Sequence, residues 1–166
     1  GQLLTIGHAG ASYTIRLPLI GAYQAANALV AAGLVLATGG DAAQTFDALS
    51  RLQPVRGRLE RAAINQAGAP VYVDYAHTPD ALAAAIAALR PHVAGRLILV
   101  FGAGGDRDQG KREPMGAIAS ALADVAIVTD DNPRSEDAAA IRRDVMKGAP
   151  GLSEIGDRRA AIAAAV

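Results

Sequence analysis

The feature that most constrains the fold is a repeat of short, wholly apolar segments, each followed by a polar loop and then by a helix-like stretch. Runs that are apolar at consecutive residues are typical of strands buried on both faces. Their alternation with helices predicts an α/β fold, a parallel sheet flanked by helices. The predicted strands are 71–73, 96–101, 125–129 and 152–155, and the predicted helices are 79–89, 114–123, 137–147 and 157–166.

Three polar loops follow the predicted strands, at residues 74–80, 102–111 and 130–136. Because crossovers between parallel strands are right-handed, the carboxyl ends of the strands meet at one edge of the sheet. Open α/β sheets bind ligands at that edge. We therefore expect the three loops to converge on a ligand.

The first third of the chain has a different pattern. Short segments at 5–6 and 13–17 predict two antiparallel strands around a glycine-containing loop at 7–12. Helices are predicted over 22–38 and 41–52. Residues 53–58 (Gln-Pro-Val-Arg-Gly-Arg) have no periodicity and are interpreted as a linker between two domains.

Composition excludes several classes of protein. The 16 Lys and Arg balance 16 Asp and Glu, which argues against a nucleic-acid partner bound by phosphate neutralisation. The chain has no cysteine, so disulfides, thiolate metal sites and thiol nucleophiles are excluded. No apolar run reaches the roughly 18 residues that span a bilayer. We expect no membrane partner.

The glycine-rich loop at 102–111 matches two phosphate-binding patterns incompletely. Gly102 and Gly104 begin a dinucleotide fingerprint, but Arg107 stands where the third glycine belongs. Counting from Gly105 gives the spacing G-x-x-x-x-G-K, but Arg112 replaces the Ser or Thr that binds Mg²⁺. A glycine-rich turn with solvated charges remains the alternative.

The segment Asp131, Asn132, Pro133 and Arg134 has the residue types of a turn. Its predicted place at a strand end favours a ligand site instead. An arginine there can bind a carboxylate bidentately, and Asp and Asn can accept hydrogen bonds from an ammonium group. Together they would recognise a zwitterionic amino acid.

Three other polar residues have open interpretations. His77 is either a locally hydrogen-bonded histidine at a helix entry or a ligand contact. Asn27, the one strongly polar residue in an apolar helix, is either a satisfied core amide or a ligand contact. Arg58 in the linker is either solvated or faces a ligand in a cleft between domains. The spacing of the three histidines supports no zinc site, and there is no G-x-S-x-G motif.

Three motifs occur in order along the chain: VDYAHTPDAL at 73–82, FGAGGDRDQGKR at 101–112, and DNPR at 131–134 with Glu136. In these motifs the chain resembles the Mur ligases, and the resemblance covers nearly its whole length. It implies that residues 1–53 are the end of a central ATPase domain. Residues 54–166 would then be most of a Rossmann-like C-terminal domain.

The resemblance also implies an activity. A Mur ligase of this kind adds meso-diaminopimelate to UDP-N-acetylmuramoyl-L-alanyl-D-glutamate in peptidoglycan precursor synthesis. ATP activates the D-glutamate carboxylate as an acyl phosphate, which the amine attacks to give an amide. The resemblance implies a cytoplasmic ATP-dependent carbon–nitrogen ligase, a monomer that acts on small molecules.

The site residues that the resemblance implies fall into two sets. The amino acid would be bound by Arg107, Asp131, Asn132, Pro133 and Arg134. ATP would be contacted by a second set consisting of Asn27, Arg58, Asp74 and His77. No catalytic residue or metal ligand is expected within 1–166, because the family's phosphate-binding loop and Mg²⁺ ligands would precede residue 1. We therefore expect the chain alone to be inactive.

Other ligases and another class of protein remain as alternatives. Lysine-adding Mur ligases differ in the segment at 131–134. Folylpolyglutamate and cyanophycin-type ligases share a turn like that at 74–77 but are not expected to carry the 131–134 segment. A dinucleotide-binding module is the third alternative, weakened by the absent third glycine.

Overall fold

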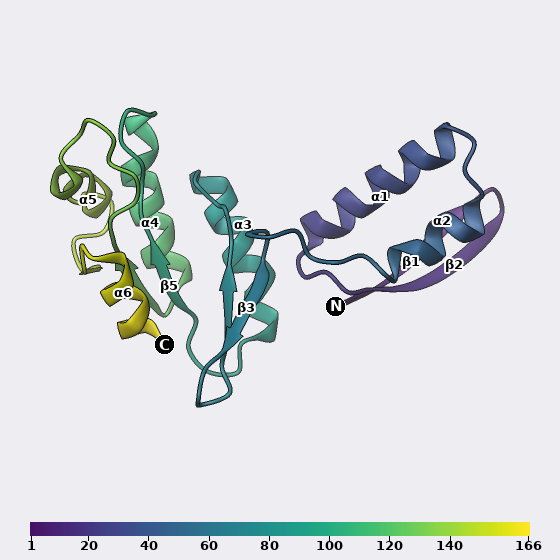
Figure 1. The fold of residues 1–166 in the computed structure, drawn as a ribbon, viewed down its shortest axis with the longest axis horizontal. Helices are drawn as coiled ribbons and strands as arrows, with labels where there is room; N and C mark the ends of the chain where they lie inside the picture. Colours follow the sequence, from purple (N-terminus) through teal and green to yellow (C-terminus); the bar gives the residue numbers. More distant parts are fainter. The chain divides into compact units, whose positions relative to one another are not determined.

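The computed structural model describes residues 1–166 and divides into two compact units (Figure 1). Unit 1 consists of residues 1–63 with 72–74, and unit 2 consists of residues 64–71 with 75–166. The domain boundary near residue 53 that the sequence suggests stays a prediction.

Unit 1 begins with a β-hairpin, in which β1 (Gln2–His8) pairs antiparallel with β2 (Ala11–Leu17). The strands extend further than the sequence predicted, because the turn between them contains only Ala9 and Gly10. Both residues have positive φ angles, 49° and 81°. Two-residue turns of this conformation match the twist of paired strands.

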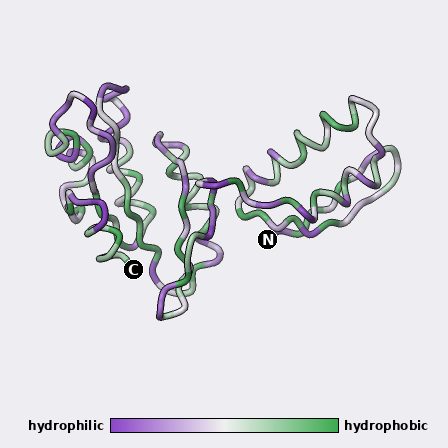
Figure 2. The backbone as a smooth tube through the Cα atoms, in the orientation of Figure 1, coloured by the Kyte–Doolittle hydropathy of each residue, from purple (hydrophilic) through white to green (hydrophobic).

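Two helices pack against this hairpin. Helix α1 (Ala22–Ala37) is mostly hydrophobic (Figure 2), and α2 (Ala42–Leu49) begins where the Asp41 carboxylate accepts a hydrogen bond from the Gln44 N–H. Helix α2 contacts both β2 and α1. The core of unit 1 is formed by Ile15, Leu17, Ala25, Ala28, Ala32, Phe46 and Leu49.

A second hairpin was not predicted. Strand β3 (Glu60–Ile64) pairs with β4 (Pro70–Val73), and the connecting turn is closed by a hydrogen bond from the Asn65 N–H to the Ala69 carbonyl. The expectation that strand 71–73 belongs to the parallel sheet is wrong, because β4 forms a two-stranded sheet with β3.

The parallel sheet lies in unit 2. It has the order β5 (Ile98–Phe101), β6 (Val125–Val128), β7 (Ser153–Glu154), with Ile98 opposite Val125 and Ile127 opposite Ser153. The short apolar strands β5 and β6 in a parallel sheet confirm the predicted α/β class. Only two of the three expected polar loops, those after β5 and β6, leave strands of this sheet.

The helices of unit 2 flank this sheet. Helices α4 (Arg112–Leu122) and α5 (Ala138–Met146) both contact β6, α6 (Arg158–Ala165) contacts β5, and α3 (Pro79–Leu89) packs on α4. Short 3₁₀ turns occupy Arg90–His92 and Gln109–Lys111. None of the helices in the chain is both long enough and apolar enough to cross a membrane.

Polar side chains fix the starts of three helices in unit 2. The Thr78 hydroxyl accepts a hydrogen bond from the Ala81 N–H, with Pro79 as the first helical residue, as the sequence predicted for α3. Asp137 and Asp157 cap α5 and α6 in the same way. Each such cap satisfies an N–H group that the helix itself leaves unpaired.

One core of unit 2 joins the sheet to α3, α4 and α5; its most buried members include Leu82, Ile86, Phe101, Met115, Ala119, Val128 and Val145. Helices α4 and α5 approach each other at backbone distance. A Cβ atom placed on Gly116 would lie 2.0 Å from the Val145 carbonyl oxygen. The loops after β5 and β6 are therefore anchored at their ends by tightly packed strands and helices.

Candidate functional site

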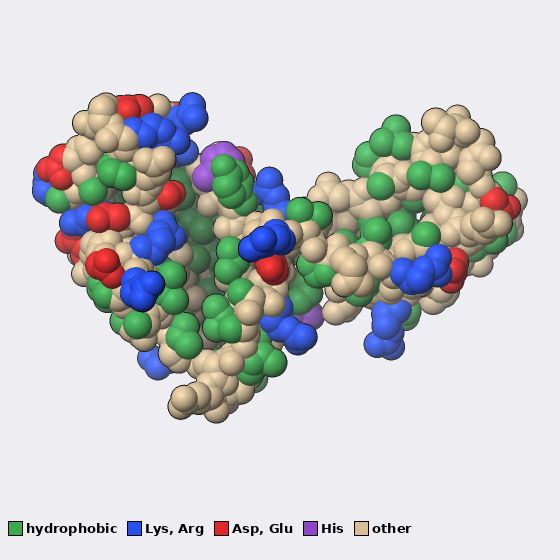
Figure 3. All heavy atoms as spheres, in the orientation of Figure 1, with side chains coloured by type: hydrophobic (Ala, Val, Ile, Leu, Met, Phe, Trp, Pro, Cys, Tyr) green, Lys and Arg blue, Asp and Glu red, His purple; other side chains and the backbone are tan.

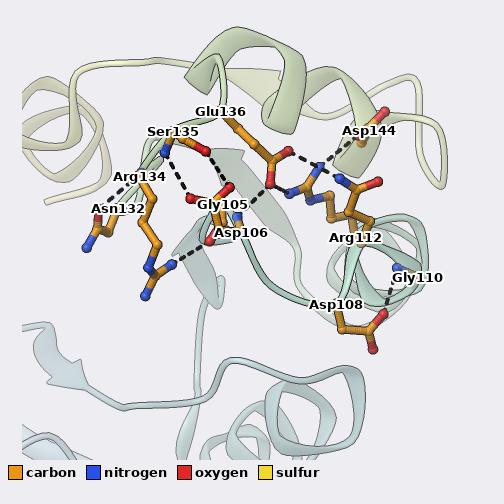
Figure 4. A network of polar contacts seen from close by, with 11 residues as sticks. Gly105, Asp106, Asp108, Gly110, Arg112, Asn132, Arg134, Ser135, Glu136 and Asp144 are labelled. Carbon is orange, nitrogen blue, oxygen red and sulfur yellow. Dashed lines mark hydrogen bonds and ion pairs between the residues drawn. The ribbon is translucent and has the colours of Figure 1, made fainter.

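The loops after β5 and β6 meet backbone to backbone (Figure 4). The Gly105 N–H donates to the Asn132 carbonyl at 2.9 Å, and the Arg134 guanidinium donates from Nη1 to the Gly105 carbonyl at 2.6 Å. A Cβ atom on Gly105 would lie 1.9 Å from the Pro133 carbonyl oxygen. Only glycine fits there, because the opposite loop occupies the place of a side chain.

Asp106 forms a second link between the same loops. Its carboxylate accepts hydrogen bonds from the Ser135 N–H (3.0 Å) and the Ser135 hydroxyl (2.7 Å), while its own N–H donates to Glu136 Oε1 at 2.6 Å. The hydrogen bond from the Ser135 hydroxyl, followed by that from the Ser135 N–H, lowers the pKa of Asp106. These bonds favour the charged carboxylate.

Behind these loops lies Arg112, the first residue of α4, whose side chain is only 2% exposed. Its guanidinium donates to Glu136 Oε1 at 2.7 Å and to Asp144 Oδ2 on α5 at 3.0 Å. The hydrogen bond with Arg112 is the largest cause lowering the pKa of Glu136, and the N–H of Asp106 lowers it further. For Asp144 the largest cause is the hydrogen bond from Lys147, followed by that from Arg112.

The structure brings the predicted amino-acid site residues to the surface of these two loops. Asn132 Oδ1 accepts from the Arg134 N–H at 3.3 Å, and Asp131 Oδ1 accepts from the Asn132 N–H at 2.8 Å. Pro133 contributes a backbone carbonyl, which accepts from the Glu136 N–H. Arg107 is exposed and makes no hydrogen bond or ion pair within the chain.

This arrangement suits a small zwitterion better than a phosphate. Three backbone N–H groups of the glycine-rich loop, those of Gly105, Asp106 and Gly110, already donate to groups of the protein. A phosphate-cradling loop needs such groups for its ligand. In contrast, none of the guanidinium N–H groups of Arg107 is hydrogen-bonded within the chain, and Arg134 uses one guanidinium nitrogen to bond the Gly105 carbonyl. The paired loops therefore carry two guanidinium groups and the Asp131 carboxylate, which can bind groups of both signs of charge.

Sequence reasoning identified Arg112 and Glu136 only as parts of motifs and gave them no role. The available signal was the failed phosphate-loop match. Arg112 occupies the position where that pattern requires Ser or Thr, and the structure shows why an arginine is there. Arg158 was missed in the same way: its Nε donates to the Asp130 carbonyl at 2.9 Å and its Nη2 lies 3.9 Å from Asp131 Oδ1.

A second cluster lies in unit 1 and includes Asn27, Arg58 and Asp74. The exposed Asn27 amide donates to Gln24 Oε1 at 3.4 Å, and the Gln24 amide donates to the Arg58 carbonyl at 3.4 Å. The Asp74 carboxylate accepts from the Leu59 N–H at 2.8 Å. Asn27 is therefore no buried core amide.

Tyr23 joins the same cluster and was not predicted. Burial, the charge of Asp74 and a hydrogen bond with Asp74 raise its pKa to about 12, while the Arg58 charge acts in the opposite direction. These causes place the phenol close to both charged side chains. The cluster thus offers a cation, a carboxylate, a phenol and an amide on one unit.

His77, the fourth residue of the predicted nucleotide set, belongs to unit 2. It is exposed, its Nδ1 lies 3.0 Å from the Tyr75 carbonyl oxygen, and its ring contacts the Tyr75 ring edge to face at 5.3 Å. The local hydrogen bond that the sequence allowed at this helix entry is present.

The chain has no cluster of side chains that could bind a metal ion. No group of three or more His, Asp or Glu side chains is arranged to hold a metal ion. The residues of this chain therefore do not provide a binding site for the Mg²⁺ that the family resemblance implies.

Two interlocked, charged loops lie at the carboxyl edge of the parallel sheet, where open α/β folds bind ligands. The family model described as "Mur ligase, glutamate ligase domain" matches residues 57–166. The chain belongs to the Mur ligase family.

Two comparisons place it within that family. The UDP-N-acetylmuramoyl-L-alanyl-D-glutamate–2,6-diaminopimelate ligase of Zymomonas mobilis is 68% identical over all 166 residues, which are 34% of that protein. The ligase of the same name from Caulobacter vibrioides is 59% identical over the same length. The chain thus spans about a third of the length of these relatives.

Solved structures agree on the fold. A structure of a UDP-N-acetylmuramoyl-L-alanyl-D-glutamate–2,6-diaminopimelate ligase is 36% identical, with a TM-score of 0.60, over 96% of this chain and 33% of its own. Folylpolyglutamate synthase from Mycobacterium tuberculosis, solved with ADP, is 27% identical with a TM-score of 0.76, over 99% of this chain and 37% of its own.

Proposed function

We propose that this chain is part of an ATP-dependent ligase that adds meso-diaminopimelate to UDP-N-acetylmuramoyl-L-alanyl-D-glutamate. Residues 1–53 would complete its central domain and residues 54–166 would form the domain that carries the amino acid. The observation that supports this best is the pairing of the loops after β5 and β6, because these two paired loops together carry Arg107, Asp131 and Arg134.

The loop residues have separate tasks in this proposal. Arg134 and Arg107 bind a carboxylate of the amino acid, and Asp131 and Asn132 accept hydrogen bonds from its ammonium group. Bound in this way at one end, the amino acid presents its other amine for reaction.

The nucleotide residues act at the other substrate. ATP supplies the phosphoryl group that activates the D-glutamate side-chain carboxylate. Attack of the amine on that carbonyl carbon then forms the amide and releases phosphate and a proton. Arg58 supplies positive charge for phosphate oxygens, Asn27 supplies amide donors, and Asp74 holds the turn at Leu59. His77 completes the proposed set.

A folate-type ligase and a lysine-adding ligase are the two alternatives to this function. The higher TM-score of the folylpolyglutamate synthase favours a folate-type ligase by fold. The identity of 68% to a diaminopimelate ligase over all 166 residues favours the amino acid of that relative. A lysine-adding enzyme is the second alternative, and lysine lacks the second carboxylate that a guanidinium would bind.

The decisive experiment replaces the matching third of the Zymomonas mobilis ligase with this chain. Phosphate release is measured with the UDP-muramoyl dipeptide, ATP and either meso-diaminopimelate or lysine. We expect turnover with meso-diaminopimelate only. Equal turnover with lysine would overturn the assignment of the amino acid.

The same chimera tests Arg134. Arg134→Ala should raise the KM for meso-diaminopimelate by a factor that corresponds to about 1.5–3 kcal/mol, because a charge-assisted contact is lost. Arg134→Lys should recover only part of this loss, since lysine cannot form the planar fork. A KM unchanged in both variants would remove Arg134 from the site.

We further propose that the enzyme is a cytoplasmic monomer acting on small molecules. Light scattering of the chimeric ligase at two concentrations tests whether it is a monomer. A mass of twice that of one chimeric polypeptide would contradict it.

A further inference from the structure

Arg112 is the one buried residue of the chain that carries a formal charge. Its Nε atom is buried without a hydrogen-bond partner. A buried ion pair contributes little net stability compared with well-packed apolar residues. Packing and stability alone therefore do not account for an arginine at this position.

The partners of Arg112 indicate another role. The Glu136 oxygen that accepts from Arg112 also accepts from the Asp106 N–H at 2.6 Å (Figure 4). The residue before Asp106 is Gly105, whose carbonyl accepts from the Arg134 guanidinium at 2.6 Å. A continuous series of bonds thus runs from the core of unit 2 to the guanidinium at its surface.

Backbone conformation adds an independent reason for this series. Asp106 and Arg134, on opposite loops, both have positive φ angles of 50° and 51°. Non-glycine residues take up this conformation at a cost and keep it where surrounding contacts enforce it. Those contacts are the bonds of Glu136 and Ser135 to Asp106, and that of Arg134 to the Gly105 carbonyl.

We propose that Arg112 is a positioning residue, which acts through Glu136 to hold the Gly105–Asp106 backbone and thereby orients the Arg134 guanidinium for the carboxylate of the incoming amino acid. The proposal rests on the proposed function for the identity of that ligand. The coupling of the two loops does not depend on it.

The two carboxylates on Arg112 provide a matched pair of variants. Glu136→Gln weakens the connection of Arg112 to the loops, whereas Asp144→Asn weakens the bonds of Asp144 to Arg112 and Lys147, both outside the loops. Each variant removes one carboxylate charge that pairs with the Arg112 guanidinium, and each should lower stability. Only the first should change the ligand site.

The kinetic test uses the chimeric ligase. Glu136→Gln and Arg112→Lys should each raise the KM for meso-diaminopimelate about tenfold, with the KM for ATP unchanged, because a displaced guanidinium loses its geometry. Asp144→Asn should stay within about twofold of the parent, because Asp144 bonds to Arg112 and Lys147 and to no residue of the two loops. Equal effects of Glu136→Gln and Asp144→Asn on the KM for meso-diaminopimelate would overturn the positioning role.

A second measurement needs no substrate. In the 166-residue chain itself, Glu136→Gln should speed hydrogen exchange at the N–H groups of Asp106 and Ser135, and Asp144→Asn should not. If the parent chimera fails to use meso-diaminopimelate, the proposed function fails, and this measurement still decides the loop coupling. Unchanged exchange in Glu136→Gln would refute the coupling itself.

Discussion

The two clusters of the chain are held together in different ways. In unit 2, the loops after β5 and β6 are joined by at least five hydrogen bonds, and a buried arginine supports them from below. In unit 1 the links run through different residues: Gln24 joins Asn27 to the Arg58 carbonyl, while Leu59 and Tyr23 interact with Asp74. Oppositely charged side chains are also interspersed on the surface over α5 (Figure 3).

Because the two clusters are connected differently, we expect them to respond differently to substitution. Residues of an interlocked network are coupled, so removing one member disturbs the others. Residues with separate contacts contribute almost independently. We therefore expect steep, shared effects in the loops of unit 2 and modest, local effects in the cluster of unit 1.

The largest effect is expected from Gly105→Ala. The added Cβ would meet the Pro133 carbonyl oxygen at 1.9 Å, so the loops must separate. We expect the KM for meso-diaminopimelate to rise on the order of 100-fold and the free energy of unfolding to fall by about 2–4 kcal/mol. Kinetics of the chimera and chemical denaturation of the chain measure the two quantities.

Gly110→Ala is the matched control in the same loop. Its Cβ would lie 3.2 Å from Asp108 Oδ1, the end of a side chain that can move. Similar effects from both substitutions would show that the loops are not interlocked at Gly105.

A smaller effect is expected from Arg58→Ala in unit 1. Removing this exposed cation should raise the KM for ATP about tenfold, which corresponds to about 1.4 kcal/mol, and leave the KM for meso-diaminopimelate unchanged. Arg56→Ala, which removes an exposed arginine two residues away, should change neither value. An equal rise in both variants would point to general electrostatics in place of a specific contact.

The smallest effect is expected from pH, and it should have opposite directions in the two units. Hydrogen bonds lower the pKa values of Asp106, Glu136 and Asp144. Their stabilisation is complete above the unfolded pKa values near 4 and is lost as the pH falls through the folded ones.

In unit 1 the sign is reversed. The pKa of Tyr23 is raised to about 12, so its contribution is complete below the unfolded value of about 10 and is lost as the pH rises through 12. Side-chain ¹³C chemical shifts of Asp106 and Tyr23, recorded from acid to strongly alkaline pH, should show acid loosening for the first and alkaline loosening for the second. Parallel changes of both would contradict the distinction between the clusters.

Much of the fold could be predicted because local signals agreed with it. Thr78 and Pro79 mark the start of α3, and apolar runs mark β5 and β6. Strand β3 was missed because it is mostly exposed and opens with Glu60 and Arg61, so neither apolar alternation nor continuity identifies it. Its pairing with β4 depends on contacts across the turn at 65–69, which periodicity does not register.

The candidate site could be predicted less completely. Loop positions followed from the order of strands and helices, and the residue types at 131–134 suggested a zwitterion. The role of Arg112 could not be predicted, because its partners Glu136 and Asp144 lie 24 and 32 residues away in the sequence. Long-range pairing of charges has no local pattern.

The bare backbone at Gly105 has a consequence for altering substrate preference. Because the loop after β6 occupies the space that a side chain of the loop after β5 would need, the two loops form one complementary surface. If residues 131–136 alone were taken from another ligase, the new loop would not fit the unchanged loop after β5. To change the amino-acid specificity of this domain, residues 102–111 and residues 131–136 should therefore be replaced together.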